Sequence, residues 1–276
     1  KWNWLAEIKS VPDNKCISPK QISLYIATKN NGFGCSIYLQ IPRIKIPIPL
    51  FIIFRALGVI EDKNICEYII LDTDCEDEKS KKILLSLRAS IVEANKYLTK
   101  EDAINYITNH VMYTPLNMDK ETGRKKKLEF TNNVLTDDLF PHCKTSEQQK
   151  YFLGYMTFRL ISCSLGFIPP DDRDSYINKR IDLTGTLLNN LFRNYFNKLV
   201  KDMTKQILRE INNGSWRTTE DYCSIVNMTN IYKIVKSTTI ENGIKRALAT
   251  GDFGIKQTSS NKVGVAQVLN RLTYIS

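Results

Sequence analysis

Residues 22–58 read ISLYIATKNNGFGCSIYLQIPRIKIPIPLFIIFRALG, and the hydrophobic period changes within this stretch. Apolar and polar residues alternate on both sides of the turn sequence Asn30-Asn31-Gly32, so residues 22–41 predict a β-hairpin. From Pro49 the apolar residues run on without alternation to Gly58, with proline in the first turn and glycine as the stop, which predicts a helix. A hairpin that leads directly into a helix indicates an α+β fold.

A second helix is predicted over residues 62–71, with Asp62 as its cap. Together with residues 51–58 it has the length of a helix-turn-helix. Its first half, Asp62-Lys63-Asn64-Ile65, offers few side chains that could contact base edges. Two helices that pack against each other are therefore the favoured interpretation.

Apolar residues recur at helical spacing through much of the remaining chain. Thr99-x-x-Asp102 resembles a capping box and Ser146-x-x-Gln149 also has the spacing of one, so a helix is expected to open at each. Gly166 and the prolines that follow it mark the clearest boundary in the chain. Beyond that boundary the pattern predicts a long amphipathic helix over residues 184–211 and a short helix over residues 239–248.

The 276 residues include 39 lysines and arginines against 29 acidic residues, which gives a formal net charge of +10. This excess suits a polyanionic partner, because phosphate neutralisation releases counterions from nucleic acid. The most apolar stretch, residues 44–54, is short and holds two prolines, so it cannot span a bilayer. Seven single cysteines suit a reducing compartment, and neither they nor the two histidines have the spacing of metal ligands. No metal site is predicted.

Two charged clusters have a functional and a structural interpretation. Residues 123–127, Gly-Arg-Lys-Lys-Lys, could contact phosphate or act as a nuclear address, but a solvated polar loop is favoured. The acidic residues within 72–78 lack the glycine and the distal glutamate of a calcium loop. A solvated loop that leads into a helix is favoured for them.

Asp171, Asp172 and Asp174 are the best candidates for metal ligands of an enzyme. However, Arg173 lies among them, and neighbouring residues of an extended segment point to opposite sides. A charged network with Lys179-Arg180 is therefore favoured. Because the chain also lacks a phosphate-binding glycine loop and a nucleophile with its base, we predict that it has no catalytic residue.

Residues 247–276 read ALATGDFGIKQTSSNKVGVAQVLNRLTYIS. They resemble the start of the fork region in the second-largest subunit of multisubunit DNA-directed RNA polymerases of the eukaryotic, archaeal and large-DNA-virus type. In that family ALATG and a variable loop precede GV-Q-VLNR-TY-S. Residues 171–192 resemble the family's DDRD…KR-DL-G-LL…LF segment. The blocks AEIKS, FRALG and FLGYM, at 6–10, 54–58 and 152–156, follow the family's order, so the resemblance covers almost the whole chain.

The resemblance implies an internal segment of such a subunit, in three parts. Residues 1–183 would be the lobe, a mixed domain with a β-hairpin or sheet and several helices. Residues 184–248 would be the largely helical, returning part of the protrusion, and residues 249–276 the truncated start of the fork. In the family these parts form one wall of the DNA cleft. The implied partners are the largest subunit, other polymerase subunits, the DNA template and the RNA–DNA hybrid, without a membrane.

The resemblance also implies nucleic-acid-binding residues near the hybrid. Lys256 and Lys262, in and beside a fork loop, would contact phosphates. Gln267 matches a glutamine that faces the hybrid backbone, and Asn270 and Arg271 beside it would either contact the hybrid or brace the fork. Amide and guanidinium groups hold phosphate oxygens without reading bases. Since the family's active-site Mg²⁺ is held mainly by the largest subunit, no cofactor is expected in this segment.

Three functional hypotheses follow. The first is a non-catalytic polymerase segment, located in a virion or a cytoplasmic viral factory if the polymerase is viral and in a nucleus if it is cellular. The second is a stand-alone, sequence-neutral nucleic-acid-binding module, and the third is a hydrolase that uses the three aspartates. Because the first half of the protrusion is missing, the isolated chain is expected to pack loosely or aggregate after about Pro170.

Overall fold

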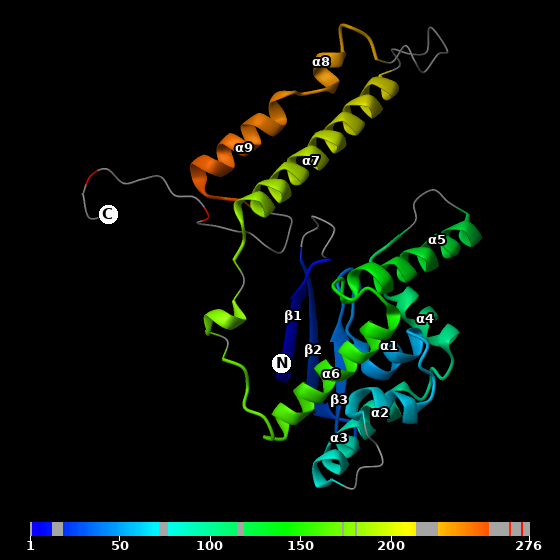
Figure 1. The fold of residues 1–276 in the computed structure, drawn as a ribbon. Helices are drawn as coiled ribbons and strands as arrows, with labels where there is room; N and C mark the ends of the chain where they lie inside the picture. Colours follow the sequence, from blue (N-terminus) through cyan, green and yellow to red (C-terminus); the bar gives the residue numbers. More distant parts are fainter. Residues whose placement is uncertain are drawn as a thin grey trace. The chain divides into compact units, whose positions relative to one another are not determined.

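The fold is described by a computed structural model with two compact units, Lys1–Ser175 and Tyr176–Ser276 (Figure 1). The residues that the structure describes are 2–12, 19–71, 77–114, 119–172, 174–179, 181–213 and 226–253, together with Val265 and Leu272. The first unit combines a sheet with helices and the second is helical, so the α+β prediction is confirmed and the first unit fits a lobe domain.

The sheet has four antiparallel strands in the order β1-β2-β3-β4. The strands are β1 (Trp2–Ser10), β2 (Lys20–Asn30), β3 (Cys35–Gln40) and β4 (Ile48–Pro49). The predicted hairpin is thus β2 and β3. Strand β1 was not predicted, although its apolar residues also alternate; it extends the hairpin by pairing along nearly all of its length with β2.

The hairpin turn is built by asparagine side chains and glycine backbone. The Asn30 carboxamide oxygen accepts hydrogen bonds from the Gly32 and Gly34 N–H groups, at 2.8 and 3.0 Å. Both glycines have positive φ, +94° and +130°, which favours glycine over other residues. The turn therefore fixes the register that brings Leu24 opposite Leu39 in the core.

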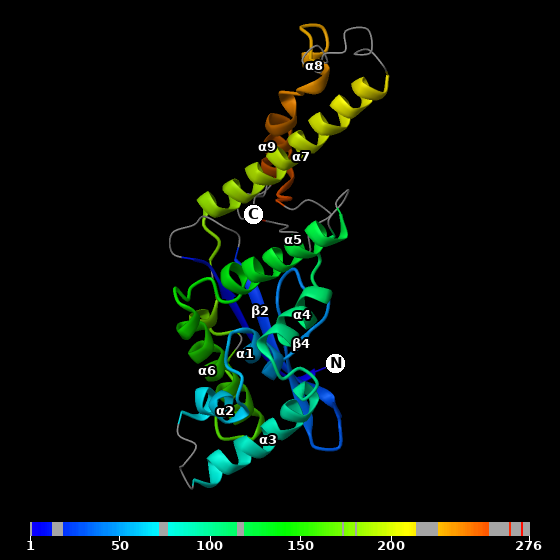
Figure 2. The same ribbon diagram turned by 90° about the vertical axis from the view of Figure 1, so that its right-hand side faces the viewer.

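The helices of the first unit gather beside this sheet (Figures 1 and 2), and α6 and α3 contact its strands. They are α1 (Leu50–Ala56), α2 (Asp62–Ile70), α3 (Glu78–Ala94), α4 (Lys100–Asn109), α5 (Lys120–Asn133), the π-helix η1 (Val134–Asp138) and α6 (Ser146–Ser164). All seven residues of α1 are buried, so this short helix is the centre of the core.

The packing-hairpin interpretation of α1 and α2 agrees with this burial. Ile65, Cys66 and Ile69 of α2 are buried, and α2 packs along α6. The predicted cap was wrong: the N-cap residue is Glu61, without a side-chain bond to the backbone. Asp62 instead pairs with Arg55 of α1 at 2.6 Å, because a buried guanidinium is a stronger partner than a helix N–H.

Helix α6 begins one residue away from the predicted position. The capping box is formed by Thr145 and Gln148, not by Ser146 and Gln149. The amide nitrogen of Gln149 is buried and donates to the Leu139 carbonyl at 2.7 Å. Gln149, which the sequence pattern assigns to the capping box, therefore forms its hydrogen bond inside the core instead.

The second unit is an antiparallel helix pair with short additions. Its elements are the 3₁₀-helix η2 (Tyr176–Asn178), α7 (Thr184–Asn212), α8 (Ile231–Ile234) and α9 (Thr238–Thr250). The predictions of helices over 184–211 and 239–248 are confirmed. Helix α9 lies along α7, and a Cβ on Gly243 would overlap the Tyr195 ring, so the pair meets closely at a glycine.

Candidate nucleic-acid interface

The nucleic-acid contacts implied by the resemblance cannot be placed in this fold. All five lie outside the described residues: Lys256, Lys262, Gln267, Asn270 and Arg271. Their roles stay predictions. The basic segment 123–127, by contrast, is described in full, and it is the most basic element of the first unit.

This segment is helical, so the prediction of a loop was wrong. It lies within α5, where Gly123 is buried and donates its N–H to the Asp119 carbonyl at 2.8 Å. A glycine in a helix lowers its stability by about 1 kcal/mol. Helix α5 has one glycine among many lysine, arginine and glutamate residues, which are good helix formers, so the helix still forms. The sequence held two further helix signals that were missed: Asp119 at the N-cap position and the Glu121–Lys125 spacing of i,i+4.

Helix α5 turns one side to the core and the other outward. Thr131 is buried on the inner side, whereas Arg124, Lys125 and Lys126 are exposed. Lys125 forms an ion pair with Glu121 at 3.1 Å in which the Lys125 side chain remains 76 % exposed. Exposed pairs of this kind contribute less than about 1 kcal/mol, so the ammonium group can exchange Glu121 for another anion.

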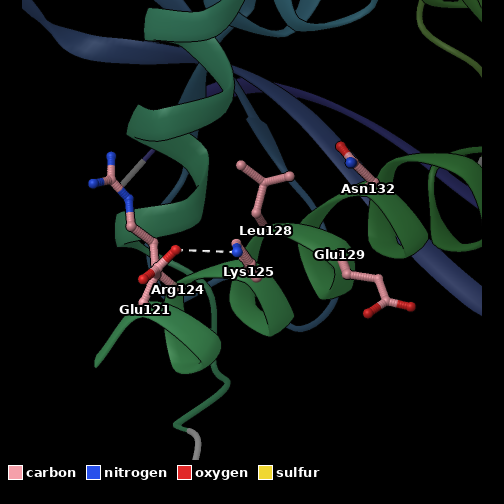
Figure 3. A pocket seen from close by; sticks show the side chains of 6 residues that line it. All are labelled: Glu121, Arg124, Lys125, Leu128, Glu129 and Asn132. Carbon is pink, nitrogen blue, oxygen red and sulfur yellow. Dashed lines mark ion pairs between the residues drawn. The ribbon is translucent and has the colours of Figure 1, made fainter. Parts of the chain in front are cut away.

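Two hollows include residues of α5 in their lining. The first, of about 370 Å³, is lined by α5 alone, with side chains of both charges around Leu128 (Figure 3). The second, of about 440 Å³, lies where α1, α4, η1 and the start of α6 meet. Asn132 lines both hollows, so the two adjoin at this residue.

A buried carboxylate holds the inner side of α5 and η1 in place. Asp138, 1 % exposed, pairs with Lys20 of β2 at 3.2 Å and with the Arg43 guanidinium. The Arg43 guanidinium also lies over the Phe130 ring of α5, 5.1 Å from its centroid. Strand β2, the turn before β4 and α5 are therefore tied together, which fixes the outer basic side relative to the core.

The aspartates proposed as alternative metal ligands form a different arrangement. Asp171 pairs with Arg159 of α6 at 2.8 Å, and the Asp172 carboxylate accepts the N–H of Asp174 at 2.9 Å. Within the described ranges, no three His, Cys, Asp or Glu side chains are grouped to hold a metal ion. Nor does any described helix combine the length and apolarity needed to cross a membrane.

Comparison with known proteins gives this fold its family. Residues 13–182 match the family described as RNA polymerase Rpb2, domain 2. The chain belongs to this Rpb2 family. The matched residues 13–182 make up more than half of the chain and nearly all of the first unit, including α5 and both hollows.

Several curated Rpb2 relatives match along almost the whole chain. DNA-directed RNA polymerase II subunit RPB2 of Schizosaccharomyces pombe is 35 % identical over 280 residues, covering 99 % of this chain and 21 % of its own length. DNA-directed RNA polymerase II subunit 2 of Arabidopsis thaliana is 33 % identical, covering 100 % and 22 %. DNA-directed RNA polymerase subunit 2 of Acanthamoeba polyphaga mimivirus is 28 % identical, covering 99 % and 22 %. The chain thus spans about a fifth of the length of these relatives.

Proposed function

We propose that the chain is a non-catalytic segment of the second-largest subunit of a DNA-directed RNA polymerase, and that it contacts nucleic acid through the exposed side of α5. The observation that carries the nucleic-acid contact is the charge of this helix. Five of its seven charged residues are basic, and it is fixed to the core by the Asp138 network. Lysine and arginine on a rigid helix can hold phosphates without reading bases, as transcription of any sequence requires.

In an assembled polymerase this surface would line the DNA cleft, with the largest subunit as a partner that holds the catalytic Mg²⁺. Residues near the end of the sequence would approach the RNA–DNA hybrid: Lys256, Lys262, Gln267, Asn270 and Arg271. The location would be a virion or a viral factory for a viral polymerase and a nucleus for a cellular one. The names of the relatives, which include plant, fungal and viral polymerase subunits, support the assembly.

Fluorescence anisotropy with two labelled DNA duplexes of unrelated sequence, and with an RNA–DNA hybrid, tests the α5 contact. We expect equal affinity for the two duplexes. The variant R124Q/K125Q/K126Q should lower the slope of log affinity against log salt by about 2.7, because three phosphate contacts are lost at about 0.9 each. K79Q/K81Q/K96Q removes the same charge from the region of α3 and is the matched control. If both variants lowered the affinity for nucleic acid equally, binding would depend on the net charge of the chain and not on α5.

The stand-alone module and the hydrolase predict other outcomes. Copurification of the complete subunit with the largest polymerase subunit supports the polymerase segment over a module that acts alone. Metal-dependent nuclease activity of the 276-residue chain that is lost in D171N would support the hydrolase. We expect no such activity, since Asp171 is engaged by Arg159.

A further inference from the structure

The larger hollow, beside Asn132, differs from the smaller one in its charge. Lys100, at the start of α4, and Lys144, just before α6, line it together with three hydroxyl-bearing residues, Thr136, Thr145 and Ser146. Among the described residues that line it, none is an aspartate or glutamate. The hollow therefore combines two ammonium groups and three hydroxyl groups without a lining carboxylate.

Two nearby carboxylates, Glu147 and Asp102, have hydrogen-bond partners outside the hollow. Glu147 accepts hydrogen bonds from Lys150, at 2.5 Å, and from the Tyr68 hydroxyl, at 2.9 Å. Asp102 is bonded to the Thr99 hydroxyl at 2.7 Å. Glu101, beside Lys100 in the first turn of α4, is a further carboxylate near the hollow, but neither it nor Asp102 nor Glu147 is among the residues that line it.

The remaining walls of the hollow are neutral. Burial raises the pKa of the Cys143 thiol, so this lining group stays protonated at neutral pH. Leu57 and Ile104 supply apolar contact area. The Lys100 ammonium lies near the Gly58 turn, because a Cβ built on Gly58 would be 4.0 Å from its nitrogen. Two cations on a neutral, partly apolar wall attract an anion more strongly than two cations in open solvent.

We propose that this hollow binds a phosphate group and continues the nucleic-acid surface of α5. The inference rests on the proposed function for the source of the phosphate, and on the hollow itself for the chemistry. A phosphate offers several acceptor oxygens, so it can take lysine ammonium groups from two sides and a hydroxyl as well. A lone carboxylate has fewer acceptor directions for this set of donors.

The geometry of α5 supports a common strand along both hollows. Lys125 and Asn132 are seven residues apart, which is two helical turns or about 10 Å. The charges of one DNA strand follow the helix axis at about 3.4 Å each, so about three phosphates span that distance. A strand that contacts Lys125 can therefore also deliver a phosphate to the hollow beyond Asn132.

Lysine acetylation footprinting of the 276-residue chain tests the site directly. The probes are inorganic tripolyphosphate and a DNA duplex, and acetylation is measured at each lysine by peptide mass spectrometry. We expect both probes to slow acetylation of Lys100 and Lys144 several-fold. Lys81 and Lys96, which are exposed but line neither hollow, are the matched controls and should react at an unchanged rate.

Paired variants measure the contribution to affinity. K100Q/K144Q should reduce the salt slope of duplex binding by about 1.8, whereas K81Q/K96Q removes equal charge and should leave it nearly unchanged. A four-fold rise in salt would then weaken the unmodified chain about twelve-fold more than K100Q/K144Q. Matching thermal unfolding curves of both variants would establish that they fold alike.

The outcomes separate this inference from the proposed function. Protection by tripolyphosphate but not by the duplex would uphold a phosphate site and overturn nucleic acid as its source. Absence of protection by either probe, or equal protection of Lys81 and Lys96, would overturn the site. In that case loss of duplex binding in R124Q/K125Q/K126Q alone would still uphold the contact through α5.

Discussion

Arg55 is the largest fully buried side chain among the described residues, and it joins three segments. Its guanidinium donates to the carbonyl oxygens of Ala94 and Tyr97, at 2.6 and 2.8 Å, and pairs with Asp62. Ala94 is the last residue of α3, and Tyr97 lies three residues beyond it in the segment that leaves the helix. The arginine of the FRALG block is thus a structural residue that closes α3 from inside the core.

Replacing Arg55 with methionine should lower the free energy of unfolding by about 3 to 5 kcal/mol, since it removes the charged donor from both carbonyls and leaves Asp62 without its partner. Urea denaturation followed by circular dichroism measures the loss. Arg88→Met is the matched control, because the exposed Arg88 guanidinium lies over the Phe33 ring and should contribute less than about 1 kcal/mol. Similar losses in the two variants would contradict a special role for the buried group.

Cys66 is predicted to be inert in the folded chain. Burial, together with the nearby carboxylates of Asp62 and Glu67, raises the pKa of its thiol to about 11. At pH 8 about one thiol in a thousand is then ionised, and only the thiolate is alkylated. We expect iodoacetamide to modify Cys66 in urea but not in the native chain, with reactivity rising as pH approaches 11. Rapid native modification at pH 8 would contradict this environment.

At the scale of single elements, α6 shows how a cap is selected. Threonine and serine are adjacent at 145–146, and either could begin the helix by pattern. The capping box forms at Thr145, whose hydroxyl accepts the Gln148 N–H. Gln149 is not free to complete a box with Ser146, because its side-chain amide donates to the carbonyl oxygens of Thr136 in η1 and of Leu139 just after it. Local propensity allowed both choices, and the core decided between them.

Thr145→Ala should therefore destabilise the first unit by about 1 kcal/mol, as measured by its urea midpoint. Ser146→Ala should be nearly neutral, since Ser146 is exposed and alanine is a good helix former. The reverse order of the two effects would show that the helix begins at the position expected from sequence.

The contact between α6 and α2 depends on Gly154. A Cβ at this position would overlap the carbonyl oxygen of Tyr68, a backbone atom that cannot rotate away. We expect Gly154→Ala to cost about 1 to 3 kcal/mol, because the two helices must separate. Gly185→Ala, in α7 with nothing within 4 Å, is the control and should be neutral or stabilising. A neutral Gly154→Ala would refute the close approach.

At the scale of the whole molecule, the two units differ in how well they bury apolar groups. The first unit has a continuous core, whereas Leu191 is the one residue classed as buried along α7 in the described part of the chain. Phe192 and Phe196 are stacked with centroids 6.1 Å apart and remain about half exposed. The expected apolar face of the 184–211 helix is therefore present.

We expect the chain to bind a dye specific for exposed apolar surface, and F192S/F196S to reduce that binding markedly. Y151S/Y155S removes two similarly exposed rings from α6 and is the control; it should change dye binding little, because those rings lie on a well-packed unit. Unfolding should show a broad transition for the second unit. A sharp transition without dye binding would contradict loose packing.

Much of the fold could be predicted from the sequence because its signals are local. The hairpin, α1, α4, α7 and α9 follow from period, turn residues and caps, which depend on neighbouring residues alone. Strand β1 was missed because its apolar residues, Trp4, Ala6 and Ile8, have no turn sequence that links them to a partner. The basic helix α5 was missed because glycine and a run of lysines suggested a loop.

The sequence by itself determined the α+β class, most element positions, the positive charge and, through blocks such as FRALG and ALATG, the resemblance to a polymerase subunit. Only the tertiary structure decided the partners of Arg55 and Asp138, the cap of α6 and the meeting of Lys100 with Lys144 at one hollow. The physical reason is the distance along the sequence over which each kind of interaction acts. Period and capping act over one or two helical turns, whereas burial and ion pairing join residues far apart in sequence, whose positions depend on the packed core.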